Sequence, residues 1–216
     1  MAAPSNTVLT WDVPHRLWHA SFGGAICVSL FTGLDGSIDA MDLHIGCGVL
    51  VLALLLFRAG WAIWGGPYER LRQYHTSPRA IFQQFRRRSA DGSPHTPAGA
   101  AMALTMFVCA LAQAGSGLFA SDDIVTDGPF VRRVSSAAVE LATSIHTRLY
   151  WVVLALAVLH VTALAWYAMR RDPVPRSMLT GRMVSALPPI TGHYWLRAAV
   201  TALAAAAIVW TAARWA

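Results

Sequence analysis

Long apolar stretches separated by short polar ones dominate the chain. Five of these stretches are long enough to cross the hydrocarbon core of a membrane as helices, which takes about 20 residues. They cover residues 15–33, 44–65, 97–119, 145–169 and 195–214. Basic residues and two adjacent glycines interrupt the first stretch, so an amphipathic helix on the membrane surface is the alternative there. The pattern predicts an all-α integral membrane bundle, with residues 1–216 forming a single membrane domain.

The charge composition supports a membrane protein and indicates its orientation. Only 13% of the 216 residues are charged, whereas soluble domains carry about 25%. All 17 basic residues are arginine. With a cytoplasmic N-terminus, all of them lie on the cytoplasmic side except Arg132, Arg133, Arg148 and Arg214. The positive-inside rule therefore predicts that the N-terminus is cytoplasmic. Because topology explains the net charge of +6, no nucleic-acid partner is predicted.

The polar connections suggest how the helices follow one another. Residues 34–43 are rich in Gly and Asp and predict a turn that joins the first two spans as a hairpin. The basic run 79–88, inside the cytoplasmic loop 66–96, predicts a helix lying on the membrane surface; a solvated linker is the alternative. The loop 120–143 on the other side forms either a docking surface or a solvated turn. Four prolines in residues 170–194 argue against a long helix there.

Histidines form the clearest chemical pattern. His146 and His160 are fourteen residues apart in the fourth span, which places them within about 40° of one helical face and about 21 Å apart along the axis. An imidazole without a partner is costly in such an apolar stretch. The predicted topology puts His44 at the depth of His146, and His19 at the depth of His160. We therefore expect two histidine pairs, one towards each side of the membrane.

Two facing imidazoles favour haem over other metal groups. A porphyrin supplies four nitrogens and leaves two axial positions on iron, whereas a structural zinc site needs four protein ligands. Closing both axial positions with histidine favours electron transfer over ligand binding. A metal or proton transporter with a histidine relay is the alternative of another class. His15, one turn before His19, competes with it as a ligand, while His75, His95 and His193 are predicted to be solvated.

Other residues near the histidines have two interpretations each. The glycines beside His19 and His44 either admit a macrocycle or pack helices closely; they are Gly23, Gly24, Gly46 and Gly48. Arg58 either pairs with a haem propionate or extends to the lipid headgroups. Several tryptophans near span ends are predicted to form interface belts; they are Trp61, Trp64, Trp195, Trp210 and Trp215.

These motifs resemble the bacterial cytochrome b561 family, which includes the b-type cytochrome subunits of nickel-iron hydrogenases. The run Trp-Asp-Val-Pro-His-Arg-Leu-Trp-His at 11–19 is similar to the opening of the family, whose last histidine is a ligand. The resemblance favours His19 over His15. It also extends to His44-Ile-Gly-Cys-Gly, with Arg58, Trp61 and Gly65, and to the His146 and His160 spacing. In the third span, Gln113 and Gly117-Leu-Phe resemble a helix that contributes packing but no ligand. The fifth span resembles longer members.

The resemblance implies a dihaem membrane cytochrome of the bacterial inner membrane. His19 and His160 would bind the inner of two b-type haems, and His44 and His146 the outer one, with no separate catalytic residue. Electrons would pass between the quinone pool and a periplasmic partner such as a c-type cytochrome or a hydrogenase small subunit. The alternatives are a stand-alone quinone oxidoreductase, for example a superoxide oxidase, and a hydrogenase membrane anchor.

Overall fold

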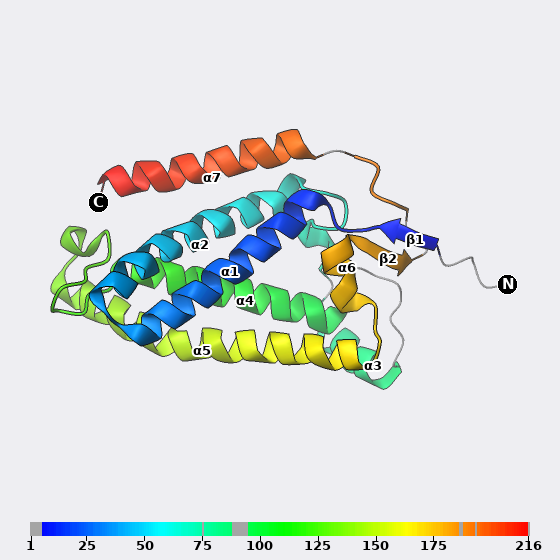
Figure 1. Ribbon diagram of the computed structural model, residues 1–216, viewed down its shortest axis with the longest axis horizontal. Helices are drawn as coiled ribbons and strands as arrows, with labels where there is room; N and C mark the ends of the chain where they lie inside the picture. The colour runs from blue at the N-terminus through cyan, green and yellow to red at the C-terminus, as the bar shows by residue number, and fades with distance from the viewer. Residues whose placement is uncertain (1–5, 75, 88–94, 186–187, 193, 216) are drawn as a thin grey trace.

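The computed structural model describes residues 6–74, 76–87, 95–185, 188–192 and 194–215. Helices dominate these residues (Figure 1). The elements in chain order are β1 (Asn6–Leu9), α1 (Val13–Asp35), α2 (Ile38–Trp64), η1 (Leu71–Gln73), α3 (Pro78–Arg87), α4 (Pro97–Gly117), η2 (Val131–Arg133), α5 (Ser136–Met169), α6 (Val174–Thr180), β2 (Arg182–Ser185) and α7 (Trp195–Trp215).

Four helices, α1, α2, α4 and α5, form an elongated bundle, and α7 packs along α2 (Figure 1). The N-terminal end of the bundle carries β1, β2, α3 and α6, while the C-terminal end carries the α1–α2 turn, the loop between α4 and α5, and the end of α7. The main helical contacts join α1 with α2, α4 with α5, and α2 with both α4 and α7. Strand β1 therefore lies at one end of the bundle and the last described turn of α7 at the other.

Lipid is the natural solvent for the surface of this bundle. Within the described residues, α1, α2, α4, α5 and α7 are long and apolar enough to cross a membrane. Their large apolar side chains point outward in many places; Phe31 is 71% exposed and Leu203 is 70% exposed. A soluble protein rarely exposes so much contiguous apolar surface. The prediction of an all-α, multi-pass membrane bundle is confirmed, and α1 is as long and apolar as a spanning helix needs to be.

Helix caps place two boundaries differently from the sequence prediction. The turn predicted at 34–43 is reduced to Gly36 and Ser37, because Gly36 ends α1 in the left-handed region at φ 67° and the Ser37 side chain accepts a hydrogen bond from the Ala40 N–H. Helix α5 begins at Ser136 rather than residue 145, since the Ser135 side chain caps it. His44 and His146 consequently lie inside their helices instead of at the helix starts.

A small antiparallel sheet at the N-terminal end was not predicted. Strand β1 pairs with β2, in register from Asn6 opposite Ser185 to Leu9 opposite Arg182. The N–H groups of Thr10 and Trp11 both donate to the Gly181 carbonyl. Strands of four residues are too short to show a clear alternation of polar and apolar positions. The sheet attaches the segment before α1 to the segment that leads into α7.

Two apolar clusters hold the helices together. Ala25, Val51, Leu55 and Ala110 join α1, α2 and α4 in the middle of the bundle. The second cluster joins α2 to α7 around Trp61, which is fully buried. The prediction that Trp61 belongs to an interface belt is therefore wrong: its indole packs under α7 instead of facing the membrane boundary.

Candidate functional site

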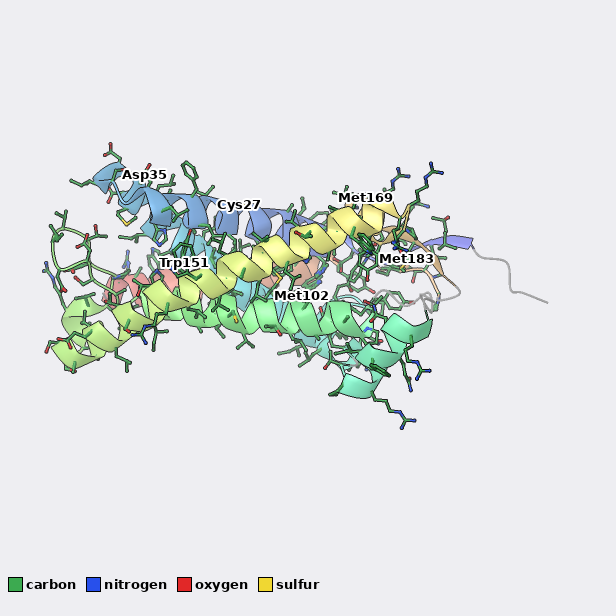
Figure 2. The ribbon with its side chains drawn as sticks, turned by 90° about the horizontal axis from the view of Figure 1, so that it is seen from below. Cys27, Asp35, Met102, Trp151, Met169 and Met183 are labelled. Carbon is green, nitrogen blue, oxygen red and sulfur yellow. The ribbon has the colours of Figure 1, made fainter. Side chains whose placement is uncertain are left out.

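The structure brings the four predicted histidines together in two pairs. The ring centroids of His19 and His160 are 6.3 Å apart, and those of His44 and His146 are 6.0 Å apart. Helix α1 runs from the N-terminal end of the bundle to Asp35 at the C-terminal end, while α5 runs in the opposite sense and reaches Met169 at the N-terminal end (Figure 2). Each pair therefore joins α5 to one helix of the α1–α2 hairpin, at opposite ends of the bundle.

The ring spacing fits two imidazoles that share one metal ion. A histidine nitrogen lies about 2.0–2.1 Å from a bound transition metal. The ring centroid lies about 1.1 Å behind that nitrogen, so two imidazoles on opposite sides of one ion have centroids about 6.3 Å apart. Both observed spacings are close to this value. The pairs thus fit the two axial positions of a haem, although the role of the four histidines as ligands stays a prediction.

Backbone carbonyls orient the rings of His44 and His146. The Nδ1 atom of His44 lies 3.0 Å from the Ser29 carbonyl oxygen, and that of His146 lies 2.9 Å from the Gln113 carbonyl oxygen. Because a carbonyl oxygen only accepts hydrogen bonds, each Nδ1 carries the ring proton. The lone pair is then on Nε2, where a metal can bind. Gln113, which by resemblance only packs, thus supports the site through its backbone.

Two glycines make room for these rings, and neither is among those expected to admit a macrocycle or to pack helices closely. An added Cβ at Gly117 would lie 2.8 Å from His146 Cε1, and one at Gly33 would lie 3.1 Å from His44 Cε1. Gly23, Gly24, Gly46 and Gly48 have nothing within 4 Å of such a Cβ. A side chain at Gly33 or Gly117 would therefore displace a histidine, which periodicity within one helix does not reveal because the contacts come from other helices.

The remaining described histidines lie at the N-terminal end and belong to neither pair. His15 is buried between Trp11 and Trp18, with ring centroids 5.4 Å away in both cases. It is His19, and not His15, that faces His160. His95 packs against Trp11 and Tyr74, and its Nε2 lies 2.8 Å from the Tyr68 carbonyl oxygen. The prediction that His95 is solvated is therefore wrong. His75 and His193 lie outside the described residues.

Arg58 is buried at the end of α2 and only 7% exposed. Its guanidinium donates to the Glu69 carbonyl oxygen, 3.1 Å away, and to the Tyr74 hydroxyl. Trp18 lies beneath the same group, with the ring centroid 5.6 Å from Cζ. The side chain therefore turns into the protein instead of extending to the membrane surface. Its Nη1 atom has no hydrogen-bond partner in the described part of the chain.

Around Arg58 the structure gathers two buried carboxyl groups that the sequence did not single out as functional. Asp12 caps α1 and is 5% exposed, while Glu69 follows α2 and is fully buried. Burial, together with the nearby Asp12 carboxylate, raises the pKa of Glu69 to about 7. Burial also raises the pKa of Asp12. The motif at 11–19 contains Asp12, but only folding brings it to Glu69.

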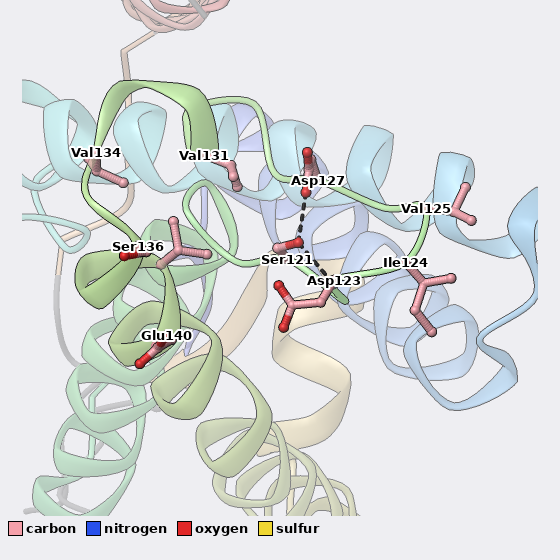
Figure 3. A pocket seen from close by; sticks show the side chains of 10 residues that line it. Ser121, Asp123, Ile124, Val125, Asp127, Val131, Val134, Ser136 and Glu140 are labelled. Carbon is pink, nitrogen blue, oxygen red and sulfur yellow. Dashed lines mark hydrogen bonds between the residues drawn. The ribbon is translucent and has the colours of Figure 1, made fainter.

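At the C-terminal end, the loop between α4 and α5 forms an open acidic depression of roughly 520 Å³ (Figure 3). Asp123, Asp127 and Glu140 line it together with the exposed Ile124 and Val125. Asp122 accepts backbone hydrogen bonds from residues 124, 125 and 126, which lower its pKa to about 2. The loop is thus an ordered turn with an acidic and apolar surface. A docking role for it stays a prediction.

Comparison with known proteins identifies one family. The family model described as prokaryotic cytochrome b561 matches residues 10–181. The match includes both histidine pairs and the helices α1, α2, α4 and α5, and it ends before α7. No curated protein and no solved structure matches the chain.

Proposed function

The chain belongs to the prokaryotic cytochrome b561 family, whose members are membrane b-type cytochromes of electron transfer, and from this premise we propose that it binds two haems and carries electrons across the bacterial inner membrane. His19 and His160 would bind one haem, and His44 and His146 the other. Bound haem would supply an iron that alternates between its ferric and ferrous states, and the two histidines of each pair would hold that iron. The observation that carries this proposal is the pair of ring spacings, 6.3 and 6.0 Å.

The protein contributes position and orientation to these sites. Fourteen residues of α5 separate His146 from His160, which corresponds to about 21 Å along the helix. Haems at these two depths would divide electron transfer across a hydrocarbon core of about 30 Å into shorter distances. The apolar cluster that contains Leu55 fills the middle of the bundle. The carbonyl groups of Ser29 and Gln113 accept hydrogen bonds from Nδ1 of the His44 and His146 rings, so the lone pair of each ring is on Nε2.

We further propose a cytoplasmic N-terminus and a periplasmic acidic end. The concentration of arginine in the connections at the N-terminal end of the bundle supports this orientation. Electrons would pass between the membrane quinone pool and a periplasmic redox protein, such as a c-type cytochrome or a hydrogenase small subunit. The depression beside Glu140 is the surface that we assign to this partner.

The histidine assignment is tested by haem content and the reduced-minus-oxidised visible spectrum. We expect two b-type haems per chain in the purified protein, with His160→Ala and His146→Ala each losing a different one. The matched controls, Val161→Ala and Ile145→Ala, change neighbouring side chains that are 63% and 42% exposed. These controls should keep both haems. A protein without b-type haem bands, or histidine variants that keep both haems, would contradict the proposal.

The partner is tested in proteoliposomes that contain a quinol and no other protein. We expect quinol to reduce the haems, with onward transfer only after a c-type cytochrome or a hydrogenase is added outside. Reduction of quinone by superoxide without any partner would instead identify a stand-alone oxidoreductase. Haems that quinol leaves oxidised would exclude the quinone pool as the membrane substrate.

A further inference from the structure

A closed polar cluster lies at the N-terminal end of the bundle, outside both histidine pairs. Its members are Asp12 at the start of α1, Arg58 near the end of α2, and Glu69 in the connection that follows. All three are less than a tenth exposed. Burying ionisable groups is costly unless each is paired or neutralised, so the partners of each group in this cluster matter.

Each carboxyl group uses one oxygen and leaves the other without a partner. Asp12 Oδ1 accepts a hydrogen bond from the His15 N–H at 2.7 Å, and Glu69 Oε1 accepts one from the Asp12 N–H at 3.1 Å. Asp12 Oδ2 and Glu69 Oε2 have no hydrogen-bond partner among the described residues. Both free oxygens point over Gly66, where an added Cβ would collide with Glu69 Oε2 and lie 2.9 Å from Asp12 Oδ2. The two oxygens are therefore neighbours in a space without a side chain.

The charges around these oxygens balance only when the carboxyl pair holds one proton. Arg58 is the cation beside them, and its hydrogen bonds go to the Glu69 carbonyl oxygen and to Tyr74, not to either carboxylate. His95 contributes no charge at neutral pH, because burial lowers its pKa to about 4. The other polar groups near Asp12 are neutral: the His15 N–H donates to it, and the Trp61 indole and the Gly66 N–H lie close to it. One arginine and two carboxyl groups are neutral with one bound proton and negative without it.

We propose that Asp12 and Glu69 form a proton-loading site, which would bind one proton when the haem that His19 and His160 would hold is reduced, and release it when that haem is oxidised. The inference rests on the function proposed above. The electron comes from quinol or from the external redox protein, and the proton comes from water at the N-terminal end. A hydronium ion in that water gives up the proton and becomes water, so one O–H bond breaks as the O–H bond of the carboxylic acid forms.

The carboxyl pair acts on the His19–His160 pair electrostatically, and the two sites lie close together along the chain. Asp12 holds the backbone of His15, which lies one helical turn before His19 on α1. An added electron is a negative charge in a medium of low dielectric constant, where charges interact strongly. This charge favours the protonated form of the carboxyl pair. By linkage, a proton on the pair makes the same site easier to reduce.

Redox titration over about pH 5 to about pH 9 tests this proposal. In the wild type, we expect the midpoint potential of the haem that His160→Ala removes to fall with rising pH, by at most about 59 mV per unit for one proton per electron. Glu69→Gln and Asp12→Asn should each remove this dependence while keeping both haems. Asparagine retains the capping role of Asp12. Asp39→Asn, which changes an exposed carboxylate at the opposite end, should behave as the wild type.

An infrared difference spectrum between oxidised and reduced protein gives a second readout. Reduction should produce a carboxylic acid band that shifts in D₂O and disappears in Glu69→Gln. A wild-type protein without this band, or Glu69→Gln and Asp12→Asn variants that keep the pH dependence, would overturn the proposal. Should Glu69→Gln lose haem, the wild-type band alone decides. Missing haem in the wild type would refute the proposed function, whereas a haem protein with pH-independent potentials would refute only the proton-loading site.

Discussion

Replacing Gly117 by alanine should loosen the haem at the His44–His146 pair. The new Cβ would lie 2.8 Å from His146 Cε1 and 3.1 Å from its Nδ1, whereas ordinary contacts begin near 3.4 Å. The ring would have to move by about 0.6 Å, which exceeds the tolerance of about 0.2 Å for metal–ligand distances. The hydrogen bond from Nδ1 to the Gln113 carbonyl oxygen, 2.9 Å long, opposes rotation of the ring.

The size of the effect follows from the cost of overpacking. Forcing an extra methyl group into a filled site typically costs about 1–3 kcal/mol. If this strain appears only in the haem-bound state, haem retention weakens roughly 5- to 150-fold. The measurement is haem transfer from the purified protein to excess apomyoglobin, followed in the visible spectrum. One of the two haems should leave faster in Gly117→Ala, and the other should leave at the wild-type rate.

Gly115→Ala is the matched control for this experiment. Gly115 lies on the same helix, two residues away, and an added Cβ there has nothing within 4 Å. Both substitutions replace a glycine of α4 by a better helix former, so a general change in the helix should affect them alike. Equal haem release from the two variants would refute the idea that Gly117 determines the position of the His146 ring.

Three further predictions concern the second glycine and the buried polar cluster. Gly33→Ala should loosen the same haem more mildly than Gly117→Ala, because its Cβ would lie 3.1 Å from His44 Cε1; Gly23→Ala is the control, and the haem-transfer assay measures both. The raised pKa of Glu69, about 7 against an ordinary 4.5, means that the folded protein binds more protons than the unfolded chain between these values. Stability should therefore fall by roughly 3 kcal/mol as pH rises through this window, and thermal unfolding in detergent should show a smaller decline for Glu69→Gln. The lowered pKa of His95, about 4 against 6.5, has the opposite sign, so stability should fall by about 3 kcal/mol as pH drops from 6.5 to 4. His95→Asn should reduce that acid-side loss, and an unchanged unfolding profile in either variant would contradict the corresponding prediction.

The acidic and basic ends of the molecule suit different roles in the proposed function. The end with Asp123, Asp127 and Glu140 presents exposed charge and apolar side chains to a soluble partner. The end with Asp12 and Glu69 instead hides its carboxyl groups, which makes their protonation sensitive to nearby charge. In the proposed function, the partner therefore docks at the end with Glu140, and protons exchange at the end with Glu69.

Local sequence signals were sufficient for the spans and the spacing of the histidines. Apolar runs predicted five spanning helices, and the fourteen-residue interval predicted that His146 and His160 share a face. The exact ends were less certain, because capping by Gly36, Ser37 and Ser135 outweighed the polar character of the neighbouring residues. A four-residue strand such as β1 leaves no comparable signal, since its partner is more than 170 residues away.

The spanning segments, the arginine-rich connections and the distance between the two histidines of α5 could all be derived from the sequence alone. These properties depend on transfer free energy, charge and helical period, and all three are local. Packing of the helices was needed to show that Gly33 and Gly117 admit the histidine rings, that Trp61 is buried beside α7, and that Asp12 contacts Glu69. Each of these contacts joins segments distant in the chain, so its energy exists only after the helices have packed.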